Sequence, residues 1–423
     1  MRSLRIGLLT DVFLPDQNGV STSVLLLQRE LRRRGHRAVI VAPRFPDYFD
    51  PETLHGVVRL PSMVNPALPR QRLAFPTRRR LSGQFDLIHT HTPGAIGFWG
   101  ARLAKRWDIP YISTFHTHLE HYAHYIPGMS TLEKHAGVLT RIVRRFYNKA
   151  DLIVAPTEAS RSMLSTYGIY RPSVVLPTGI DESLLQEAPD VVSPWPAGTR
   201  RLLSVGRLGH EKRHELVLQA LGEIRKSHDA HLVILGEGPQ LEYLRQKAAG
   251  LGLERHVTFY GSVPLSTIGA YYRLAELFLF GSDTETQGLV LAEAQTMGVP
   301  VVAVGAEGTL GSVEVGVSGQ LVGKGDWQGL AAHSAALLSD LHAMEAMSLG
   351  ARQFARRFSS SKMAEQMLDI YLQALSQQGW RSPGSEYGGL WTGAHDRAGA
   401  YDKASSYDKA NRQNIRKYGL RGF

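Results

Sequence analysis

The chain has 423 residues, of which 43% are hydrophobic, and this length is enough for two or three domains with full cores. It contains no cysteine, which excludes disulfides, thiolate metal sites and cysteine nucleophiles. The formal net charge of +10 indicates an acidic partner, and the candidates are nucleic acid, an anionic membrane surface and a phosphorylated substrate.

The N-terminal half alternates short apolar runs with longer amphipathic segments. The first run, RIGLLT, ends at Asp11 without a small-residue cleavage site, so it predicts a buried strand and not a signal peptide. Later runs include AVIVAP, DLIHTHT, IPYISTFHT and DLIVAPT. Continuous apolar strands separated by helices are typical of a parallel sheet covered on both faces. No window reaches the roughly 20 apolar residues of a transmembrane helix, so membrane contact is expected to be peripheral.

A second α/β half follows a proline-rich segment. Residues 187–199 have no helical period, which predicts a linker. The rhythm restarts with RLLSVGRL and HLVILGEG, so two facing doubly wound domains are predicted over 1–186 and 200–360, with a ligand where their strand ends meet. Residues 361–378 are expected to form a helix that closes the second domain. Residues 379–423 are dominated by Gly, Ser, Tyr and charged residues and are expected to form a flexible tail.

The turn DVFLPDQNGVSTSV leads from the first strand into a helix. Ser21 or Thr22 is expected to cap that helix, and Gly19 to bring the backbone close to a ligand phosphate. The pattern GxGxxG does not occur in the chain, which argues against a dinucleotide dehydrogenase.

Four histidines crowd the segment TFHTHLEHYAHYIPG, the first of which is His116. His118, His121 and His124 share a helical face at three-residue spacing and could bind zinc. Such sites usually have a further fixed ligand, so no metal is expected. The remaining alternatives for these three are an acceptor cleft and a polar loop.

A loop of the second half, VGRLGHEKRHE, places Arg207 and Lys212 between a strand and a helix. A guanidinium offers a fork to phosphate oxygens and an ammonium offers a point charge, which together suit a diphosphate. A solvated loop is the alternative.

The segment SDTETQGLVLAEA holds two glutamates, Glu285 and Glu293, with a predicted helix that starts near Gln287. Their spacing allows both carboxylates to face one elongated ligand. The backbone amides of Gly288 and Leu289 at the helix N-terminus form a potential anion site. The alternative is a capping glutamate followed by a solvated one.

Two basic stretches lie in the first half, PRQRLAFPTRRRLSG and Lys134 to Lys149. Their arginines are Arg70, Arg72, Arg78, Arg79, Arg80, Arg141, Arg144 and Arg145. Apolar and aromatic residues lie among them, which fits docking to an anionic membrane, where each cation contributes about 1 kcal/mol. A nucleic-acid surface competes with this interpretation, but no RNP, zinc-finger or helix-turn-helix pattern supports it. A solvated face is a further alternative for the second stretch.

These motifs together resemble the retaining glycosyltransferases of family 4, whose GT-B fold consists of two facing Rossmann-like domains. The resemblance covers about residues 4–376, and Glu285-x7-Glu293 followed by MGVPVVA is its most specific mark. It implies that Glu285 contacts hydroxyls of the donor sugar and that Glu293 contacts the nucleotide ribose.

The same resemblance implies roles for residues of other loops. Arg207 and Lys212 match the diphosphate-binding pair, and Gly19 matches the N-terminal glycine loop. His116 matches the active-site histidine that hydrogen-bonds the donor sugar. No metal or other cofactor is implied, and nucleic acid is not expected as a partner.

The chain reads ETQG where the family commonly has EGFG, and TGID where it has NGID. The ETQGL variant and THLEHYAHYI look like the bacterial diacylglycerol glycosyltransferases. This likeness implies transfer of glucose or galactose from a UDP-sugar to the sn-3 hydroxyl of diacylglycerol, at the inner face of the cell membrane. Thr286 and Gln287 lie next to the donor pocket, which leaves the sugar open. The alternatives are a phosphatidylinositol, polyprenyl-linked or soluble sugar acceptor, and a non-enzymatic scaffold that binds nucleic acid.

Overall fold

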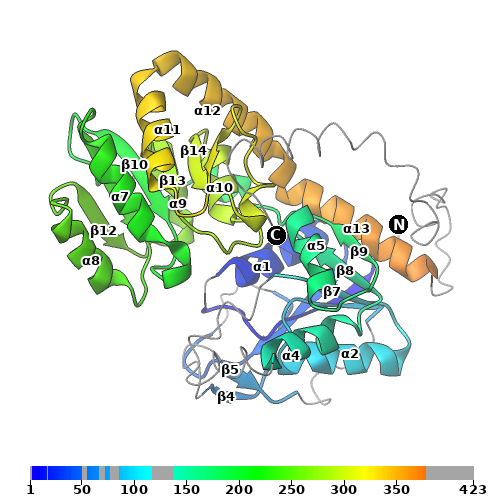
Figure 1. Ribbon diagram of the computed structural model, residues 1–423. Coiled ribbons are helices and arrows are strands. Elements are labelled where there is room, and N and C mark those ends of the chain that lie inside the picture. The colour runs from blue at the N-terminus through cyan, green and yellow to red at the C-terminus, as the bar shows by residue number, and fades with distance from the viewer. Residues whose placement is uncertain are drawn as a thin grey trace.

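The computed structural model describes residues 2–16, 18–49, 55–65, 72–76, 85–116 and 137–377. These residues form two α/β domains, each built on a parallel sheet (Figure 1). The predicted architecture of two doubly wound domains is therefore confirmed. In both sheets the strand order reverses direction beside a central strand, and ligands of such sheets bind at the carboxyl ends of the strands around that point.

The first domain contains a sheet of order β3-β2-β1-β6-β7-β8-β9, with every described pair parallel. Its strands are β1 (Arg5–Leu9), β2 (Arg37–Pro43), β3 (Val57–Leu60), β6 (Leu87–Thr90), β7 (Tyr111–Thr114), β8 (Leu152–Ala155) and β9 (Ser173–Val175). Its helices are α1 (Gly19–Arg33), α2 (Ala95–Trp107), α4 (Val138–Tyr147) and α5 (Glu158–Thr166). An antiparallel hairpin of β4 (Ser62–Val64) and β5 (Arg72–Ala74) lies outside this sheet.

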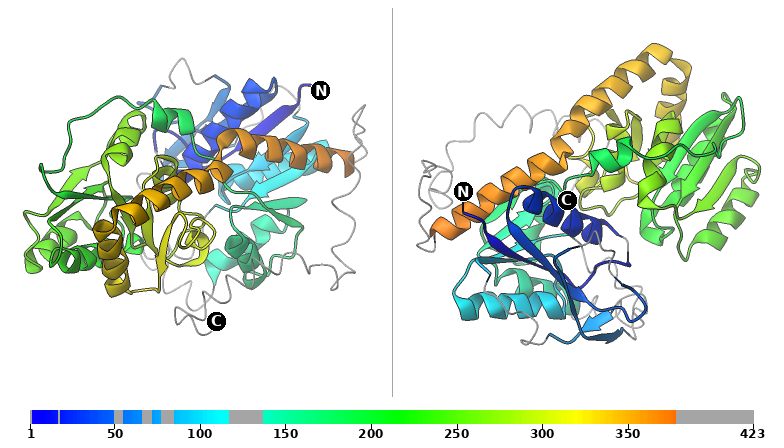
Figure 2. Two further views of the ribbon diagram at one scale, coloured as in Figure 1. Left: turned by 90° about the horizontal axis from the view of Figure 1, so that it is seen from above. Right: turned by 180° about the vertical axis from the view of Figure 1, so that it is seen from behind.

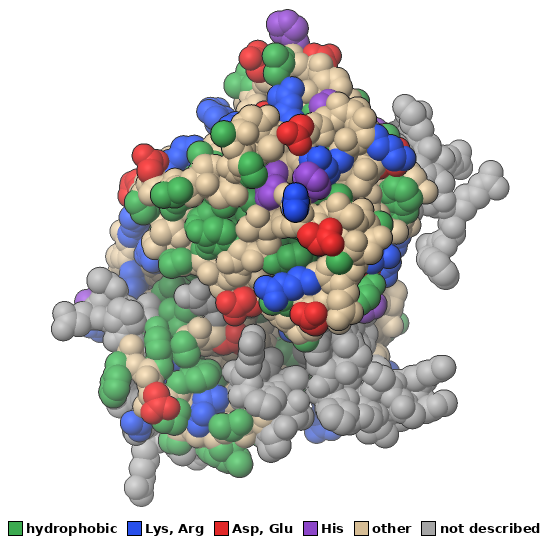
Figure 3. Space-filling view, turned by 90° about the vertical axis from the view of Figure 1, so that its left-hand side faces the viewer, with side chains coloured by type: hydrophobic (Ala, Val, Ile, Leu, Met, Phe, Trp, Pro, Cys, Tyr) green, Lys and Arg blue, Asp and Glu red, His purple; other side chains and the backbone are tan. Residues whose placement is uncertain are grey.

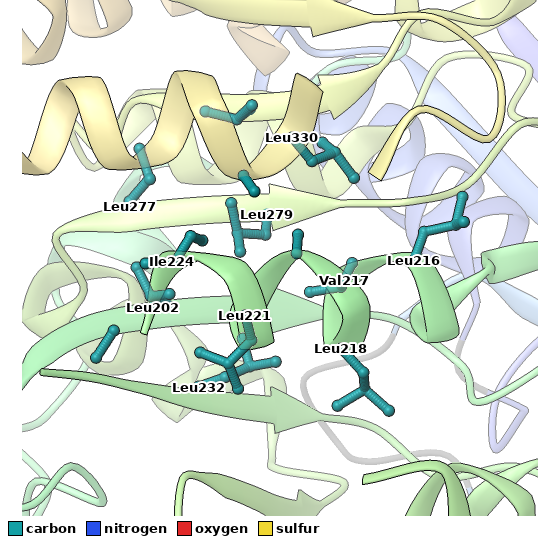
Figure 4. Close-up of a cluster of buried hydrophobic side chains, with 14 of the residues drawn as sticks. Leu202, Leu216, Val217, Leu218, Leu221, Ile224, Leu232, Leu277, Leu279 and Leu330 are labelled. Atoms are coloured by element: carbon teal, nitrogen blue, oxygen red, sulfur yellow. The ribbon is translucent and has the colours of Figure 1, made fainter. Parts of the chain in front are cut away.

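The second domain contains a sheet of order β12-β11-β10-β13-β14-β15. Its strands are β10 (Arg200–Val205), β11 (Ala230–Leu235), β12 (Val257–Gly261), β13 (Leu277–Phe280), β14 (Val301–Val304) and β15 (Gly319–Val322). Its helices are α7 (His214–Ile224), α8 (Leu241–Gly250), α9 (Leu265–Leu274), α10 (Leu289–Thr296), α11 (Trp327–Ser339) and α12 (Leu341–Ala355). Figure 4 shows Leu221 of α7 and Leu330 of α11 among leucines of the strands, in one buried cluster.

The connection between the domains is anchored to the second one. Helix α6 (Glu182–Gln186) packs closely on α9, because a Cβ on Gly269 would lie 1.9 Å from the carbonyl oxygen of Leu185. The following residues carry no helix or strand up to β10. Within them the buried indole of Trp195 donates from Nε1 to the carbonyl oxygen of Leu202 at 3.1 Å. The last residues of the expected first domain thus already contact the second.

The last described helix, α13 (Ser360–Gln377), packs on the first domain, so the expectation that it closes the second domain was wrong. It lies against α1 and shares a core with Leu27 and Leu31 of that helix. Figure 2 shows it crossing from one domain to the other. An amphipathic pattern indicates that a stripe is buried, but it does not identify the partner surface. The stripe that α13 buries consists of Met363, Ala364, Met367, Leu368, Tyr371 and Leu375.

Replacement of Met367 by Ala is expected to destabilise the first domain by about 2–5 kcal/mol, because it leaves a cavity in the core that α13 completes. Hydrogen exchange should show faster exchange in β1 and β2 and unchanged exchange in β10 and β11. Gln366→Ala on the exposed face of the same helix is the control. Loss of protection confined to the second sheet would contradict this packing.

Candidate active site

The carboxyl ends of the two sheets meet through a loop that follows β13. The hydroxyl of Thr286 in this loop donates to the carbonyl oxygen of His116, just after β7, at 2.9 Å. The hydroxyls of Thr157 and Ser160 at the start of α5 lie 3.0 Å from the carbonyl oxygen of Thr286, which accepts from them. The loop of Glu285 and the histidine expected at the site are therefore neighbours across the domain boundary.

Helix α1 begins at this boundary with a reciprocal cap. Asn18 accepts with its side chain from the backbone N–H groups of Val20 and Ser21, at 3.0 and 3.1 Å. Ser21 in turn accepts with Oγ from the backbone N–H of Asn18 at 2.9 Å. The expectation that Ser21 or Thr22 caps the helix was therefore wrong, since Asn18 is the cap and Ser21 is its partner in the capping box.

Helix α10 faces the start of α1. It begins at Leu289, two residues later than expected, because Gly288 has a φ of +72°, a left-handed conformation that favours glycine. A Cβ on Gly19 would lie 3.5 Å from Cδ1 of Leu289. The N-termini of two helices, one from each domain, thus lie side by side, and both present partial positive charge.

The side chain of Gln287 joins the two domains. Its Oε1 accepts from the backbone N–H of Thr178 at 2.7 Å, and its Nε2 donates to the carbonyl oxygen of Thr178 at 3.0 Å. Only 3% of Gln287 is exposed. The amide expected at the donor pocket is used on the TGID segment, which leaves the backbone of Gln287, and not its side chain, for a donor.

The two cations expected to bind a diphosphate lie on one loop and are both paired with carboxylates. Arg207 follows β10 and donates from Nη2 to Oε1 of Glu211 at 2.7 Å. Lys212, at the end of the 3-10 helix η3 (His210–Lys212), forms an ion pair from Nζ to Oε1 of Glu285. Lys212 and Glu285 are 73 residues apart in the sequence, and the fold brings them together at the strand ends.

The second glutamate of the motif has a different environment. Glu293 lies on α10 and accepts with Oε2 from the hydroxyl of Tyr272, on α9, at 2.8 Å. Burial raises the pKa of Glu293, and the hydrogen bond from Tyr272 offsets part of that effect. One glutamate is thus held by a cation and the other by a phenol.

Three histidines form a column at the ends of β6 and β7. His89 contacts the hydroxyl of Tyr371 through Nδ1 and Oγ1 of Thr114 through Nε2, both at 2.7 Å. Its ring centroid lies 4.2 Å from that of His91, and Nδ1 of His91 lies 2.9 Å from Nε2 of His116. Burial lowers the pKa of His89 to about 3 and that of His116 to about 4, and it lowers the pKa of His91 well below its usual range. The column is neutral at pH 7.

His89 and His91 were not predicted, although the run DLIHTHT offered a signal. Side chains two apart on a strand share a face, so both rings follow from the strand period. Asp11 was not predicted either. It follows β1 and accepts from the backbone N–H groups of Ile96 and Gly97 at 2.8 and 3.1 Å. Asp11 thereby holds the start of α2 at the same edge of the sheet.

Several predicted residues lie outside the described part of the chain. These are His118, His121, His124, Arg70, Arg78, Arg79 and Arg80, together with the tail 379–423. Within the described residues no group of three histidine or carboxylate side chains is placed to hold a metal ion.

The basic residues of α4 form its exposed face, where Arg141, Arg144 and Arg145 lie. Val143 and Phe146 of the same helix are buried in the core, so the expectation that they form part of a docking face was wrong, whereas Ile142 is 38% exposed. Arg72 contacts Ser62 across the β4–β5 hairpin, with Nε 2.8 Å from Oγ.

The β4–β5 hairpin exposes further apolar side chains. Apolar side chains gather in the lower part of Figure 3, on the side of the first domain where β4 and β5 lie. Those on or beside the hairpin, each 43–51% exposed, are Met63, Val64, Leu73 and Phe75. Among the described helices, none is long and apolar enough to cross a membrane.

Comparison with known proteins agrees with this geometry. The model of the family "Glycosyl transferases group 1" matches residues 186–354, and that of "Glycosyltransferase Family 4" matches residues 17–184. An alpha-monoglucosyldiacylglycerol synthase of Streptococcus pneumoniae is 33% identical over 318 residues, which are 71% of this chain and 71% of that protein. The chain belongs to glycosyltransferase family 4. It is a glycosyltransferase with the GT-B fold.

Two further similarities bear on this family-4 glycosyltransferase. A phosphatidyl-myo-inositol mannosyltransferase of Mycobacterium leprae is 28% identical over 380 residues, covering 87% of this chain and 96% of that protein. Anabaena HepE, solved in complex with UDP-glucose, superposes with a TM-score of 0.68 at 21% identity, over 88% of this chain and all of that one. The second similarity supports the fold.

Replacement of His89 by Gln is expected to flatten the pH dependence of the free energy of unfolding between about pH 6.5 and pH 4. The folded pKa of His89 is about 3 and the ordinary value is 6.5, so in this window the unfolded chain takes up a proton that the folded one does not. Stability is therefore lost as the pH falls, by up to about 1.4 kcal/mol per pH unit for one such group.

Urea unfolding at several pH values measures this slope. His342→Gln, at an exposed position of α12, is the control and should keep the wild-type slope. Equal slopes for wild type and His89→Gln would contradict a buried neutral imidazole.

Proposed function

We propose that this glycosyltransferase moves a glucosyl or galactosyl group from a UDP-sugar to the sn-3 hydroxyl of diacylglycerol, with retention at the anomeric carbon. The observation that carries the proposal is the ion pair of Lys212 with Glu285, beside Arg207 and across from His116. The acceptor is supported by the name of the Streptococcus pneumoniae relative, and UDP-glucose is the ligand in the HepE structure.

The cations and the start of α10 would stabilise the leaving group. In a front-face displacement the acceptor hydroxyl attacks the anomeric carbon while the bond from that carbon to the diphosphate oxygen breaks. The leaving phosphate takes the proton of the hydroxyl. Negative charge then grows on the diphosphate. Arg207, Lys212 and the backbone amides of Gly288 and Leu289 would face that charge, and their fixed positions mean that little reorganisation is needed.

The remaining polar groups would hold the sugar and the ribose. Glu285 accepts from sugar hydroxyls while Lys212 keeps its carboxylate in place. His116 contacts the sugar from the first domain. Oε2 of Glu293 accepts a hydrogen bond from Tyr272, and we propose that Oε1 accepts one from a ribose hydroxyl. Gly19 lies near enough to Leu289 to bring the start of α1 to the phosphates. No metal is required in this scheme.

The acceptor side would dock on the inner face of the cell membrane. The exposed arginines of α4 supply charge for anionic lipid, and the apolar side chains of the β4–β5 hairpin supply insertion. Both elements belong to the first domain, which carries His116.

Replacement of Lys212 by Ala is expected to lower kcat for sugar transfer by about 100-fold or more, because it removes a charge aimed at the leaving diphosphate. It also leaves Glu285 without its ion pair, so the orientation of the sugar suffers. Steady-state kinetics with labelled donor measure the loss. Lys226→Ala, at an exposed lysine of the same domain, should retain the wild-type rate. A Lys212→Ala enzyme with an unchanged rate would remove Lys212 from the proposed site.

A variant with Arg141, Arg144 and Arg145 changed to Gln is expected to bind anionic liposomes about 100-fold more weakly, since each surface cation contributes about 1 kcal/mol. Sedimentation with vesicles of phosphatidylglycerol and phosphatidylcholine measures the affinity. The control is a triple Gln variant of exposed residues on the second domain, Lys226, Arg245 and Arg255. Similar losses in both variants would indicate attraction by net charge and not by α4.

The function itself is tested by transfer from labelled UDP-glucose, UDP-galactose and GDP-mannose to diacylglycerol in anionic liposomes, with and without EDTA. Glycolipid from a UDP-sugar that persists in EDTA supports the proposal and identifies the sugar. If phosphatidylinositol replaces diacylglycerol and GDP-mannose then gives product, a mannosyltransferase with a phosphatidylinositol acceptor is favoured. This second candidate rests on the Mycobacterium leprae relative. Product that requires metal would refute the metal-free scheme.

A further inference from the structure

The contact between His91 and His116 constrains where the protons of both rings lie. Nδ1 of His91 and Nε2 of His116 are 2.9 Å apart, a distance at which one nitrogen donates and the other accepts. Burial disfavours a charged imidazole at either position, so the two neutral rings carry only two N–H protons between them. One of these protons lies in the contact, and the other lies on an outer nitrogen of one ring. Only two tautomer combinations remain.

The outer nitrogen of His91 distinguishes the two combinations. Its Nε2 is buried and has no hydrogen-bond partner within the described part of the chain. The neighbouring His89 does not supply one, because its two nitrogens already contact Tyr371 and Thr114. An orphaned buried N–H is rarer than an unsatisfied acceptor. Nε2 of His91 is therefore the nitrogen without a proton, and the proton of His91 is on Nδ1.

We propose that His91 is a positioning residue that sets the tautomer of His116. His91 donates from Nδ1 to Nε2 of His116, and His116 consequently carries its own proton on Nδ1. The ring of His116 thus offers an N–H donor from Nδ1 to an oxygen of the substrate. This last step rests on the proposed function, in which His116 contacts the donor sugar, whereas the tautomer itself does not.

The fixed surroundings of the column explain why His91 can do this. His89 packs on His91 at 4.2 Å between ring centroids, and its own ring is held on both sides by hydrogen bonds. The rings of His91 and His116 lie 27° from parallel. One of the groups that hold His89 is Tyr371 of α13, so the helix that crosses between the domains helps to fix the column.

Two-bond proton–nitrogen NMR of the full chain labelled with ring-15N histidine tests the tautomer without substrate. The His116 signal is identified by its loss in His116→Gln. We expect Nδ1–H in the wild type and in His91→Asn, whose amide can donate from the place of Nδ1. In His91→Leu we expect a shift to Nε2–H, the form that free histidine prefers. Wild-type His116 with Nε2–H, or no shift in His91→Leu, would overturn the proposal.

If His91→Leu fails to fold, His91→Gln replaces it, because its amide reaches the place of Nε2 and not that of Nδ1. Kinetics then test the consequence for transfer. His91→Leu or His91→Gln should lower kcat about tenfold with the donor KM within about twofold, and His91→Asn should recover most of the loss. Equal kcat in all variants would refute positioning. Absence of transfer by the wild type would refute the proposed function and leave the NMR result valid.

Discussion

The site depends on the loop that joins the carboxyl edges of the two sheets. Thr286 donates to the carbonyl oxygen of His116, and Gln287 pairs with both backbone groups of Thr178. Buried polar groups that lose a partner cost about 1–3 kcal/mol each, so this loop cannot leave the first domain without exposing or orphaning several of them. The loop that carries Glu285 is thereby held at a fixed distance from the first domain.

Helix α13 affects the position of the candidate site through the histidine column. The chain leaves the second domain after α12, crosses to the first and completes the core under α1. Tyr371 on its buried stripe then reaches His89. The packing of α13 is coupled by this contact to the histidine column at the ends of β6 and β7. Residues remote in sequence thus determine where His116 lies.

Much of the fold could be predicted, because a parallel sheet buried on both faces requires continuous apolar strands such as β1 and β11. The position of Arg207, Lys212 and Glu285 near strand ends could also be predicted, whereas the ion pairs of Arg207 with Glu211 and of Lys212 with Glu285 were not. Other features depend on tertiary contacts that a linear pattern does not contain. The apolar stripe of α13 does not indicate which domain it packs on. The side-chain amide of Gln287 pairs with the backbone of Thr178, which its position in the sequence does not indicate. The sequence places His91 at the end of a strand, but its contact with His116 depends on the pairing of that strand with its neighbour.

The charges of the site follow a similar logic. Arg207 is paired with Glu211 and Lys212 with Glu285, so these four side chains have no net charge. Attraction for the proposed diphosphate would therefore not arise from excess positive charge of these side chains. It would arise from the orientation of the donors, since the carboxylates hold the cations in place and the N-termini of α1 and α10 lie at the same edge. Under the proposed function the donor would bind to preformed geometry, and the loop contacts between the two domains would then contribute to that binding.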